Sequence, residues 1–292
     1  MKSQKKAYIY AIVAVLCWST IGSAFKISLH YTDFINLLLY SSGVACLILL
    51  TVILIQGKWR SLLSSHLKDL LSSAFMGLLN PFLYYLVLLK AYDLLPAQEA
   101  GTLNYIWPLV LVLLSIPMLK QQISPWSILA IGISFLGIIV ISTHGDLTTL
   151  DFSDPIGVTL AVGSAIFWAL YWICNMKDPR ESLIKLFLNF FLGFLYIFTL
   201  NLIVGGIIFP TFPLLFGATY IGVFEMGITF IIWLKALQYS ANTAKVSNLI
   251  YLSPFISLII IHFLVGEDIR LSTLIVLILI VGGIILQQYL KK

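Results

Sequence analysis

The sequence predicts an all-α integral membrane protein, in which ten transmembrane helices form two inverted five-helix repeats around a central cavity. Composition is the first observation. Of the 292 residues, 60% are hydrophobic and 10% are charged, and the mean hydropathy is +1.03. A soluble domain is about half apolar and about one quarter charged. This composition excludes a water-soluble globule, a disordered chain and a nucleic-acid partner. The three cysteines all lie in apolar stretches, so a disulfide scaffold is excluded too.

Ten long apolar stretches are the second observation. They cover residues 7–28, 34–55, 69–92, 97–118, 124–143, 155–176, 182–205, 213–237, 241–264 and 270–290. Each is close to the ~20 residues that a helix needs to cross the hydrocarbon layer. The first stretch follows three lysines, as a signal peptide would, but it is too long for one. We therefore expect it to be retained as a span.

Charge orients these spans. With the N-terminus in the cytoplasm, every Lys and Arg except Lys26, Lys90 and Arg270 falls in a tail or a joint on the cytoplasmic side. Cytoplasmic joints carry the excess of basic residues in membrane proteins. The distribution predicts a multi-pass protein of the cell (inner or plasma) membrane, with both termini in the cytoplasm.

An internal repeat is the third observation. Segments 77–91 and 222–236 both begin with glycine and end in Leu-Lys-Ala, 145 residues apart, and the Tyr105–Pro108 segment aligns with Tyr251–Pro254. The repeat divides the chain into a first half, 1–145, and a second half, 146–292. Because each half holds five spans, the second half is inverted relative to the first. Inverted repeats place a solute site near the membrane midplane and support alternating access.

Glu225 is the leading candidate for the site, since it lies near the middle of its span. An ionisable group at that depth is costly and usually faces a cavity or a partner. Its repeat equivalent is Asn80, and each has a polar neighbour four residues on, Thr229 and Tyr84, which predicts a polar stripe on each helix. Glu225 could bind a substrate ammonium group or exchange a proton. Alternatively, it could be a buried, protonated acid that joins helices.

Other polar and aromatic residues lie within spans, away from the interfaces where Trp and Tyr usually collect. They could stack on a planar or cationic solute, or could serve only helix packing. The aromatic candidates are Trp18, Tyr105, Trp107, Trp168, Tyr171 and Tyr251, and the amide candidates are Asn104 and Asn248. Pro108 and Pro254 match in the repeat, which suggests hinges in two gates, although static kinks would also explain them.

The sequence resembles the drug/metabolite transporter superfamily with EamA-type repeats, and within it the YddG-type exporters of aromatic amino acids. The resemblance is carried by Cys17–Thr20, Leu103–Pro108, Phe167–Tyr171 and Leu252–Pro254. It implies a basket of ten helices whose central cavity is lined by spans one, three, four, six, eight and nine. The segment Phe224–Gly227 departs from the aromatic amino acid exporters, because Glu225 stands where a neutral residue is expected.

The resulting hypothesis is a secondary transporter that exports amino acids, aromatic ones above all, or related small metabolites by alternating access. Exporters of cationic drugs or nucleosides are the main alternative, followed by an intramembrane enzyme or a channel. Motifs for catalysis, metal binding and nucleotide binding are absent from the sequence, so we expect no enzyme activity, no metal and no cofactor. The expected partners are a small-molecule substrate, membrane lipid and, as a candidate coupling ion, protons. We expect a monomer.

Overall fold

The structure is a computed structural model that describes residues 3–120, 132–133, 136, 154–240, 246 and 248–289. The elements it defines within these ranges are all helical. Before residue 120 they are α1 (Gln4–Ser19), α2 (Ile21–Leu29), α3 (Phe34–Ile55), α4 (Trp59–Leu63), α5 (Leu67–Gly77), η1 (Leu78–Leu83), α6 (Tyr84–Leu94), α7 (Ala97–Asn104) and α8 (Trp107–Leu119). After residue 153 they are α10 (Pro155–Lys177), α11 (Ser182–Val204), α12 (Phe212–Ile221), η2 (Gly222–Gly227), α13 (Ile228–Tyr239), η3 (Asn248–Leu252), α15 (Ser253–Val265) and α16 (Leu271–Tyr289).

Seven helical stretches in the described part of the chain are long and apolar enough to cross a membrane. They are Gln4–Leu29, Phe34–Ile55, Leu67–Leu94, Ala97–Met118, Pro155–Lys177, Ser182–Val204 and Phe212–Tyr239. Two shorter apolar helices, Leu249–Val265 and Leu271–Gly283, match the ninth and tenth predicted spans. The fifth predicted span, 124–143, lies outside the described residues except for 132–133 and 136. The complete ten-span layout therefore stays a prediction.

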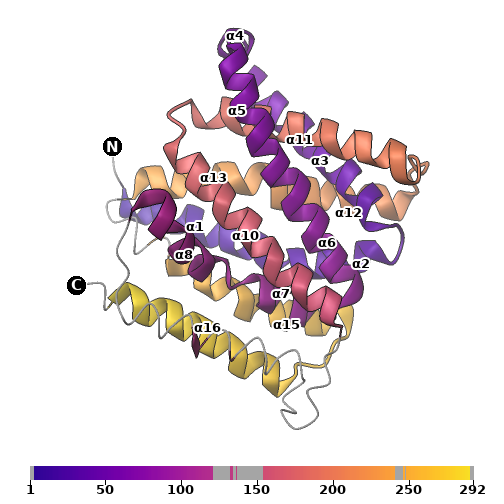
Figure 1. Ribbon diagram of the computed structural model, residues 1–292, viewed down its shortest axis with the longest axis vertical. Helices are drawn as coiled ribbons and strands as arrows, with labels where there is room; N and C mark the ends of the chain where they lie inside the picture. The colour runs from indigo at the N-terminus through magenta and orange to yellow at the C-terminus, as the bar shows by residue number, and fades with distance from the viewer. Residues whose placement is uncertain are drawn as a thin grey trace.

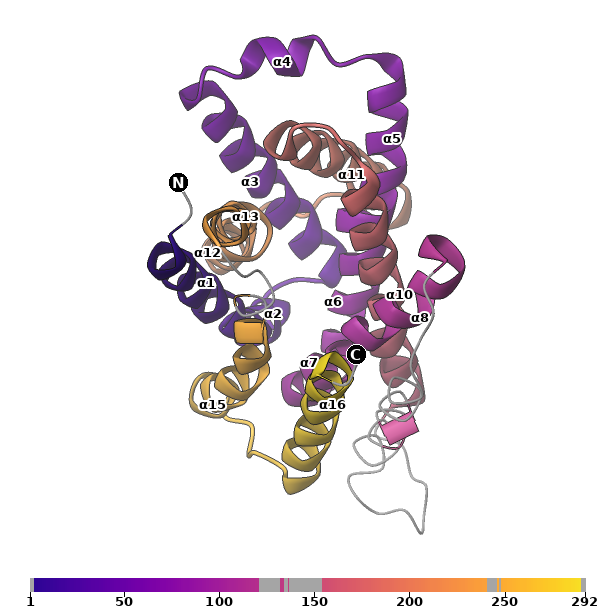
Figure 2. The ribbon, with the colours of Figure 1, turned by 90° about the vertical axis from the view of Figure 1, so that its left-hand side faces the viewer.

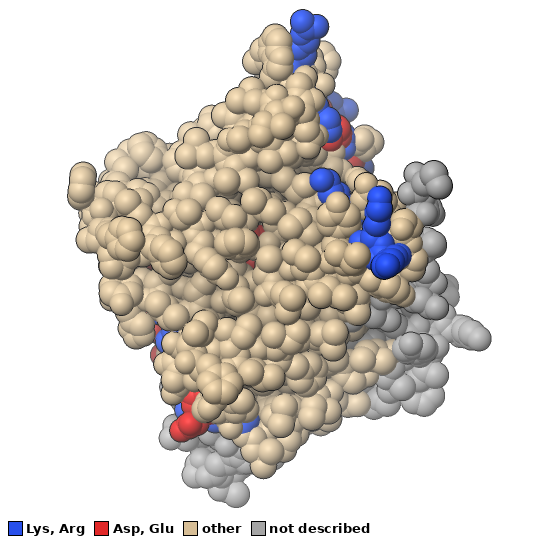
Figure 3. Space-filling view, turned by 180° about the vertical axis from the view of Figure 1, so that it is seen from behind, with Lys and Arg blue, Asp and Glu red and all other residues tan. Residues whose placement is uncertain are grey.

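The distribution of charge agrees with a membrane-embedded bundle. In Figure 3 a broad face carries almost no charged side chains, and the Lys, Arg, Asp and Glu side chains gather near its edges. The start of α1 and the end of α16 lie on the same side of the bundle, at the left of Figure 1.

Several predicted spans contain a short irregular segment. The first span breaks at Thr20, the third at η1, the fourth between α7 and α8, and the eighth at η2. Asn80 has extended backbone angles (φ −152°, ψ 120°) within η1. Pro108 and Pro254 lie in the first turns of α8 and α15. A proline costs little there, because first-turn N–H groups have no partner within the helix. These prolines begin helices instead of kinking them.

The helices pack across the two halves that the repeat defines. The most extensive contacts join α1 to α13, α6 to α10, and α3 to α11. Figure 2 shows α13 almost end-on, between α1 and α3. Two glycines allow the backbones of neighbouring helices to approach closely. A Cβ atom on Gly77 would lie 2.5 Å from the carbonyl oxygen of Asn189 in α11, and one on Gly222 would lie 2.6 Å from that of Ser41 in α3.

Candidate functional site

A cavity of about 340 Å³ lies between the broken helices. Its walls come from α1, α2, α6, α7, α8, α10, η2, α13, η3 and α15. This volume is at the lower end of the usual range for small-molecule sites, about 300–1,000 Å³. The walls come from both ends of the chain, so the cavity exists only when the two halves are packed together.

Most of the predicted site residues line this cavity. They are Trp18, Tyr84, Asn104, Tyr105, Trp107, Trp168, Glu225, Tyr251 and the proposed hinge residue Pro254. Four other predicted residues are not among its lining residues, and they are Asn80, Pro108, Tyr171 and Thr229. The side chain of Asn248 lies outside what the structure describes.

The helix breaks explain why Asn80 and Thr229 lie away from the cavity. Residues four apart share a face only in a regular α-helix, and η1 and η2 interrupt both helices at this point. Asn80 is fully buried in η1, which packs against α10 and α11. The Thr229 hydroxyl donates instead to the carbonyl oxygen of Phe224, five residues back. The prediction of a continuous polar stripe on each helix is therefore wrong.

The remaining predicted residues have simpler positions. Tyr171 is fully buried and packs with Met76 and Leu79. Asn248 begins η3, and Pro108 is in the first turn of α8. On α10 it is Trp172, four residues after Trp168, that reaches the cavity in place of Tyr171.

Glu225 is held at the cavity wall by one hydrogen bond. The hydroxyl of Tyr85 donates to its Oε1 atom at 2.8 Å, and Tyr85 itself is fully buried behind the wall. Glu225 is only 8% exposed. Among the described lining residues it is the one Asp, Glu, Lys, Arg or His side chain. The cavity therefore presents a single carboxyl group that a solute can reach.

Hydrogen bonds fix several of the neutral polar groups around Glu225. The Tyr84 hydroxyl donates to Oδ1 of Asn104 at 3.4 Å, and Nδ2 of Asn104 donates to the Ser164 hydroxyl at 2.8 Å. The Tyr105 hydroxyl donates to the carbonyl oxygen of Ile250 at 2.5 Å. These bonds join α6, α7 and α10, and also α7 to η3, so the wall is positioned by elements from both halves.

Aromatic rings make up much of the remaining wall. The Trp168 ring centroid lies 4.6 Å from that of Tyr84, 5.8 Å from that of Trp172 and 6.4 Å from that of Trp107. Elsewhere in the cavity lining, the ring centroids of Trp18 and Trp233 are 5.5 Å apart. Such rings offer faces on which a planar group can stack or a cation can rest.

Four lining aromatics were missed by the sequence reasoning, and one of them is Phe25 in α2. Trp172 follows Trp168 by four residues, and Tyr92 follows Tyr84 by eight, so helical spacing would have found both. Trp233 lies beyond the break at η2, where regular spacing from Glu225 gives no guidance.

A polar cluster joins the start of α7 to the loop between α15 and α16. The carboxylate of Glu267 accepts hydrogen bonds from the backbone N–H groups of Ala97 and Gln98, at 2.7 and 3.1 Å. Arg270 pairs with the fully buried Glu99. A carboxylate at a helix N-terminus satisfies open N–H groups and the helix dipole. Because Gln98 also lines the cavity, this cluster fixes one end of its wall.

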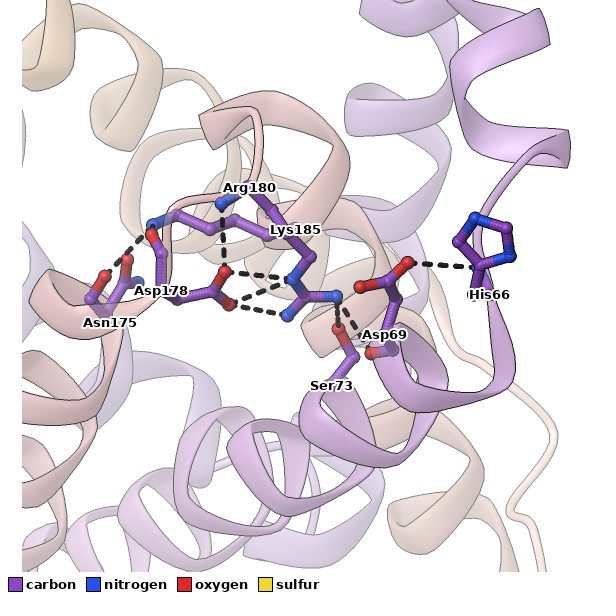
Figure 4. A network of polar contacts seen from close by, with 7 residues as sticks. All are labelled: His66, Asp69, Ser73, Asn175, Asp178, Arg180 and Lys185. Atoms are coloured by element: carbon purple, nitrogen blue, oxygen red, sulfur yellow. Dashed lines mark hydrogen bonds and ion pairs between the residues drawn. The ribbon is translucent and has the colours of Figure 1, made fainter.

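A second polar cluster joins the segment between α10 and α11 to α5, as Figure 4 shows. Arg180 lies between Asp178 and α5. Its Nε and Nη2 atoms donate to the Asp178 carboxylate. Its Nη1 atom donates to the carbonyl oxygen of Asp69 and to the hydroxyl of Ser73, both in α5. Lys185 donates to the carbonyl oxygens of Asn175 and Asp178. Within the described residues, no group of three or more His, Cys, Asp or Glu side chains is arranged to hold a metal ion.

The fold and the cavity define a class, that of helical membrane proteins with a solute-sized cavity between broken helices. The family model described as the EamA-like transporter family matches residues 5–143 and 155–287. The chain belongs to the EamA-like transporter family.

Three relatives carry names that agree with this family. An "Uncharacterized transporter" of Clostridium kluyveri is 26% identical over 183 residues, which cover 60% of this chain and 58% of the relative. The "Uncharacterized transporter YvbV" of Bacillus subtilis is 26% identical over 225 residues, covering 74% of this chain and 71% of the relative. The "Uncharacterized transporter in sor 3'region" of Acidianus ambivalens is 27% identical over 170 residues, covering 57% and 65%. The matched parts thus span from 58% to 71% of these relatives.

A crystal structure of another protein has a similar fold. It aligns with 99% of this chain and 100% of its own, with a TM-score of 0.67 and 19% sequence identity. At this identity the likeness concerns the fold alone.

Proposed function

We propose that this protein is a secondary transporter that moves small, amine-bearing organic solutes across the cell membrane through the central cavity. The observation that carries the proposal is Glu225, a single carboxyl group in an otherwise neutral, aromatic-walled cavity inside a helical bundle. Membership of the EamA-like transporter family supports it independently.

Alternating access is the mechanism that fits this arrangement best. The cavity is bounded by helices that are interrupted at its level, at η1, η2 and the starts of α8 and α15. Half-helices of this kind can move as separate rigid pieces on either side of a solute site. Glu225 would bind the solute ammonium in one state, and a proton could take its place on the carboxylate in the return step.

Export of aromatic amino acids is the first specific activity to test, because the aromatic walls suit a ring and Glu225 suits an amino group. Cationic drugs and nucleosides are the next solutes. A catalytic interpretation lacks support, because Glu225, the one Asp, Glu, Lys, Arg or His among the described lining residues, has a tyrosine as its partner and not a nucleophile or a metal.

The test is efflux of labelled phenylalanine, tryptophan, tyramine and threonine from preloaded proteoliposomes, with and without a pH gradient. We expect efflux of ring-bearing amines above that of empty liposomes, and little efflux of threonine. Trp168→Leu should reduce it, because it removes the ring at the centre of the aromatic wall. Asp93→Asn, which alters a half-exposed acid paired with Lys90, is the matched control. Efflux of none of these solutes from folded, inserted protein would overturn the proposal.

A further inference from the structure

We propose that the cavity selects organic cations that carry an aromatic ring and no carboxylate, so that an arylalkyl monoamine is preferred over the corresponding amino acid. This inference rests on the proposed function, because it names the substrate class of the same cavity. The inference depends on which side chains line the cavity together. The described lining contains one acidic side chain and several tryptophan rings, and no basic side chain.

Charge balance is the first step of the argument. An amino acid brings an ammonium group and a carboxylate, and each needs a partner when it leaves water. Glu225 can serve the ammonium group. Among the described lining residues no Lys, Arg or His can serve the carboxylate. A solute carboxylate would meet only neutral groups and the like charge of Glu225.

Two basic side chains in the described part of the chain, Lys26 and Arg270, are already engaged elsewhere. Lys26 donates to the carbonyl oxygens of Tyr92 and Leu95, at 2.9 and 2.7 Å, and is not among the lining residues. Arg270 is paired with Glu99. Neither side chain would reach a solute carboxylate without giving up these contacts.

Backbone donors do not replace a missing base at the start of α8, which borders the cavity. Helix starts often bind anions through open N–H groups. Here Pro108 has no N–H group. Four of the N–H groups around this break already donate to backbone carbonyls, and they belong to Tyr105, Ile106, Leu109 and Val110. The break therefore leaves few open N–H groups for an anion.

The aromatic wall favours a cation as well as a ring. Trp18, Trp107 and Trp168 all line the cavity, and an indole face attracts an ammonium group through its negative quadrupole. A cation can thus be shared between Glu225 and a ring face while its own aromatic group stacks on another. The cavity volume of about 340 Å³ suits a solute with one or two rings.

The experiment compares four indole solutes whose side chains carry different charged groups. Tryptamine is a cation, tryptophan a zwitterion and indole-3-propionate an anion. The N,N,N-trimethyl derivative of tryptamine is a permanent cation that does not leak through lipid. Transport of each is measured with wild-type protein in proteoliposomes, against empty liposomes. We expect kcat/KM for tryptamine to exceed that for tryptophan at least tenfold, the trimethyl derivative to be carried, and indole-3-propionate to stay at background.

The outcomes separate the inference from the function on which it rests. Tryptophan carried as well as tryptamine, or better, would leave the transporter standing and overturn the cation preference. Transport of indole-3-propionate at a comparable rate would overturn it too. If none of the four solutes moves, the proposed function fails and the inference falls with it.

Glu225→Gln tests the assigned residue. The glutamine keeps the volume and can still accept from Tyr85, so we expect folded protein in which the tryptamine preference falls below threefold. The matched control Asp93→Asn should keep the preference of the wild type. A ratio of tryptamine to tryptophan transport that stays at the wild-type value in Glu225→Gln would overturn the assignment of the preference to Glu225.

Discussion

Tyr85 holds the Glu225 carboxyl group from a position that the solute does not reach. Its ring is fully buried, and its hydroxyl donates to Oε1 at 2.8 Å. Tyr85→Phe removes this bond without changing the shape of the cavity. We expect KM for an amine substrate to rise about threefold to tenfold with little change in kcat, as the loss of one hydrogen bond of ~1 kcal/mol implies. The measurement is initial transport rate against substrate concentration.

Tyr40→Phe is the matched control for Tyr85→Phe. It also removes one hydroxyl, which in Tyr40 donates to the carbonyl oxygen of Ile208 and not to a cavity group. Its KM should stay at the wild-type value. An equal rise of KM in both variants would show that lost tyrosine hydroxyls act through general stability, and Tyr85 would have no positioning role.

For single residues, the sequence could predict which side chains have suitable chemistry better than it could predict which of them face the cavity. Glu225 and Trp168 could be selected because an ionisable or aromatic side chain at mid-span is unusual, and both line the cavity. Asn80 was selected as the repeat equivalent of Glu225, and Thr229 by regular helical spacing from it. Asn80 instead has extended backbone angles within η1, and η2 interrupts the regular helix before Thr229. The binding role of every candidate stays a prediction.

At the scale of the helices, two glycines allow close contacts between the backbones of neighbouring helices. Gly77 approaches the backbone of α11 and Gly222 that of α3, and an added Cβ atom would lie 2.5 and 2.6 Å from a carbonyl oxygen, respectively. Because backbone cannot retreat as a side chain can, we expect Gly77→Ala and Gly222→Ala each to destabilise the protein by about 1–3 kcal/mol. The measurement is thermal unfolding in detergent.

Gly163→Ala serves as the control for both glycine substitutions. Gly163 lies within α10, and an added Cβ atom there would meet nothing within 4 Å. Alanine should be neutral or should stabilise the helix, by up to about 1 kcal/mol. A gain in melting temperature for Gly77→Ala or Gly222→Ala would mean that these helices do not pack as closely as described.

The cluster in Figure 4 makes the attachment of the α10–α11 joint to α5 dependent on pH. Burial alone would raise the pKa of Asp178, but the hydrogen bonds and charge of Arg180 outweigh it and hold the pKa below its usual value. A depressed pKa contributes stability that is present above the unfolded-state value, about 3.9, and is lost as pH falls through the lower folded-state value. We therefore expect Asp178→Asn to lower the melting temperature at pH 7 and to reduce the additional loss below pH 4.

Two variants check the origin of this effect. Arg180→Gln should reproduce the loss at pH 7, since it leaves a largely buried carboxylate without its cation. Lys68→Gln removes one positive charge from an exposed side chain at the start of α5 and should change little. A melting temperature of Asp178→Asn equal to that of the wild type at pH 7 would contradict the assignment.

The ends of most helices could be predicted from the length of the apolar stretches, but the irregular segments within them could not. Seven predicted spans coincide with long apolar helices to within a few residues, because hydrocarbon thickness dictates helix length. The break at Thr20 could not be predicted from its own residue type, because neither proline nor glycine stands at the position between α1 and α2. Hydropathy continues unchanged through a break, so a pattern of apolar residues does not register it.

For the whole molecule, the packing of the two halves extends what the repeat predicts. Gly77 and Gly222 begin the two matched segments, 145 residues apart, and each fits against a helix of the other half. The irregular segments η1 and η2 begin 144 residues apart, at Leu78 and Gly222. An irregular segment thus recurs at a similar place in both halves, and the division of the chain near residue 145 stays a prediction. The sequence could indicate this correspondence. It could not show that the equivalent polar residues, Asn80 and Glu225, would differ in access to the cavity.

The number and direction of the crossings are a prediction of the whole chain. Ten spans with a cytoplasmic N-terminus place the C-terminus in the cytoplasm and the joint after the fifth predicted span, near residue 149, outside. In a bacterial host, we expect alkaline phosphatase fused after residue 149 to be active and a C-terminal fusion to be inactive. Green fluorescent protein at the C-terminus should be fluorescent. Active phosphatase at the C-terminus would require an odd number of crossings and would break the inverted arrangement. Inactive phosphatase after residue 149 would remove the fifth span from the layout, since the excess of basic residues fixes the preceding four.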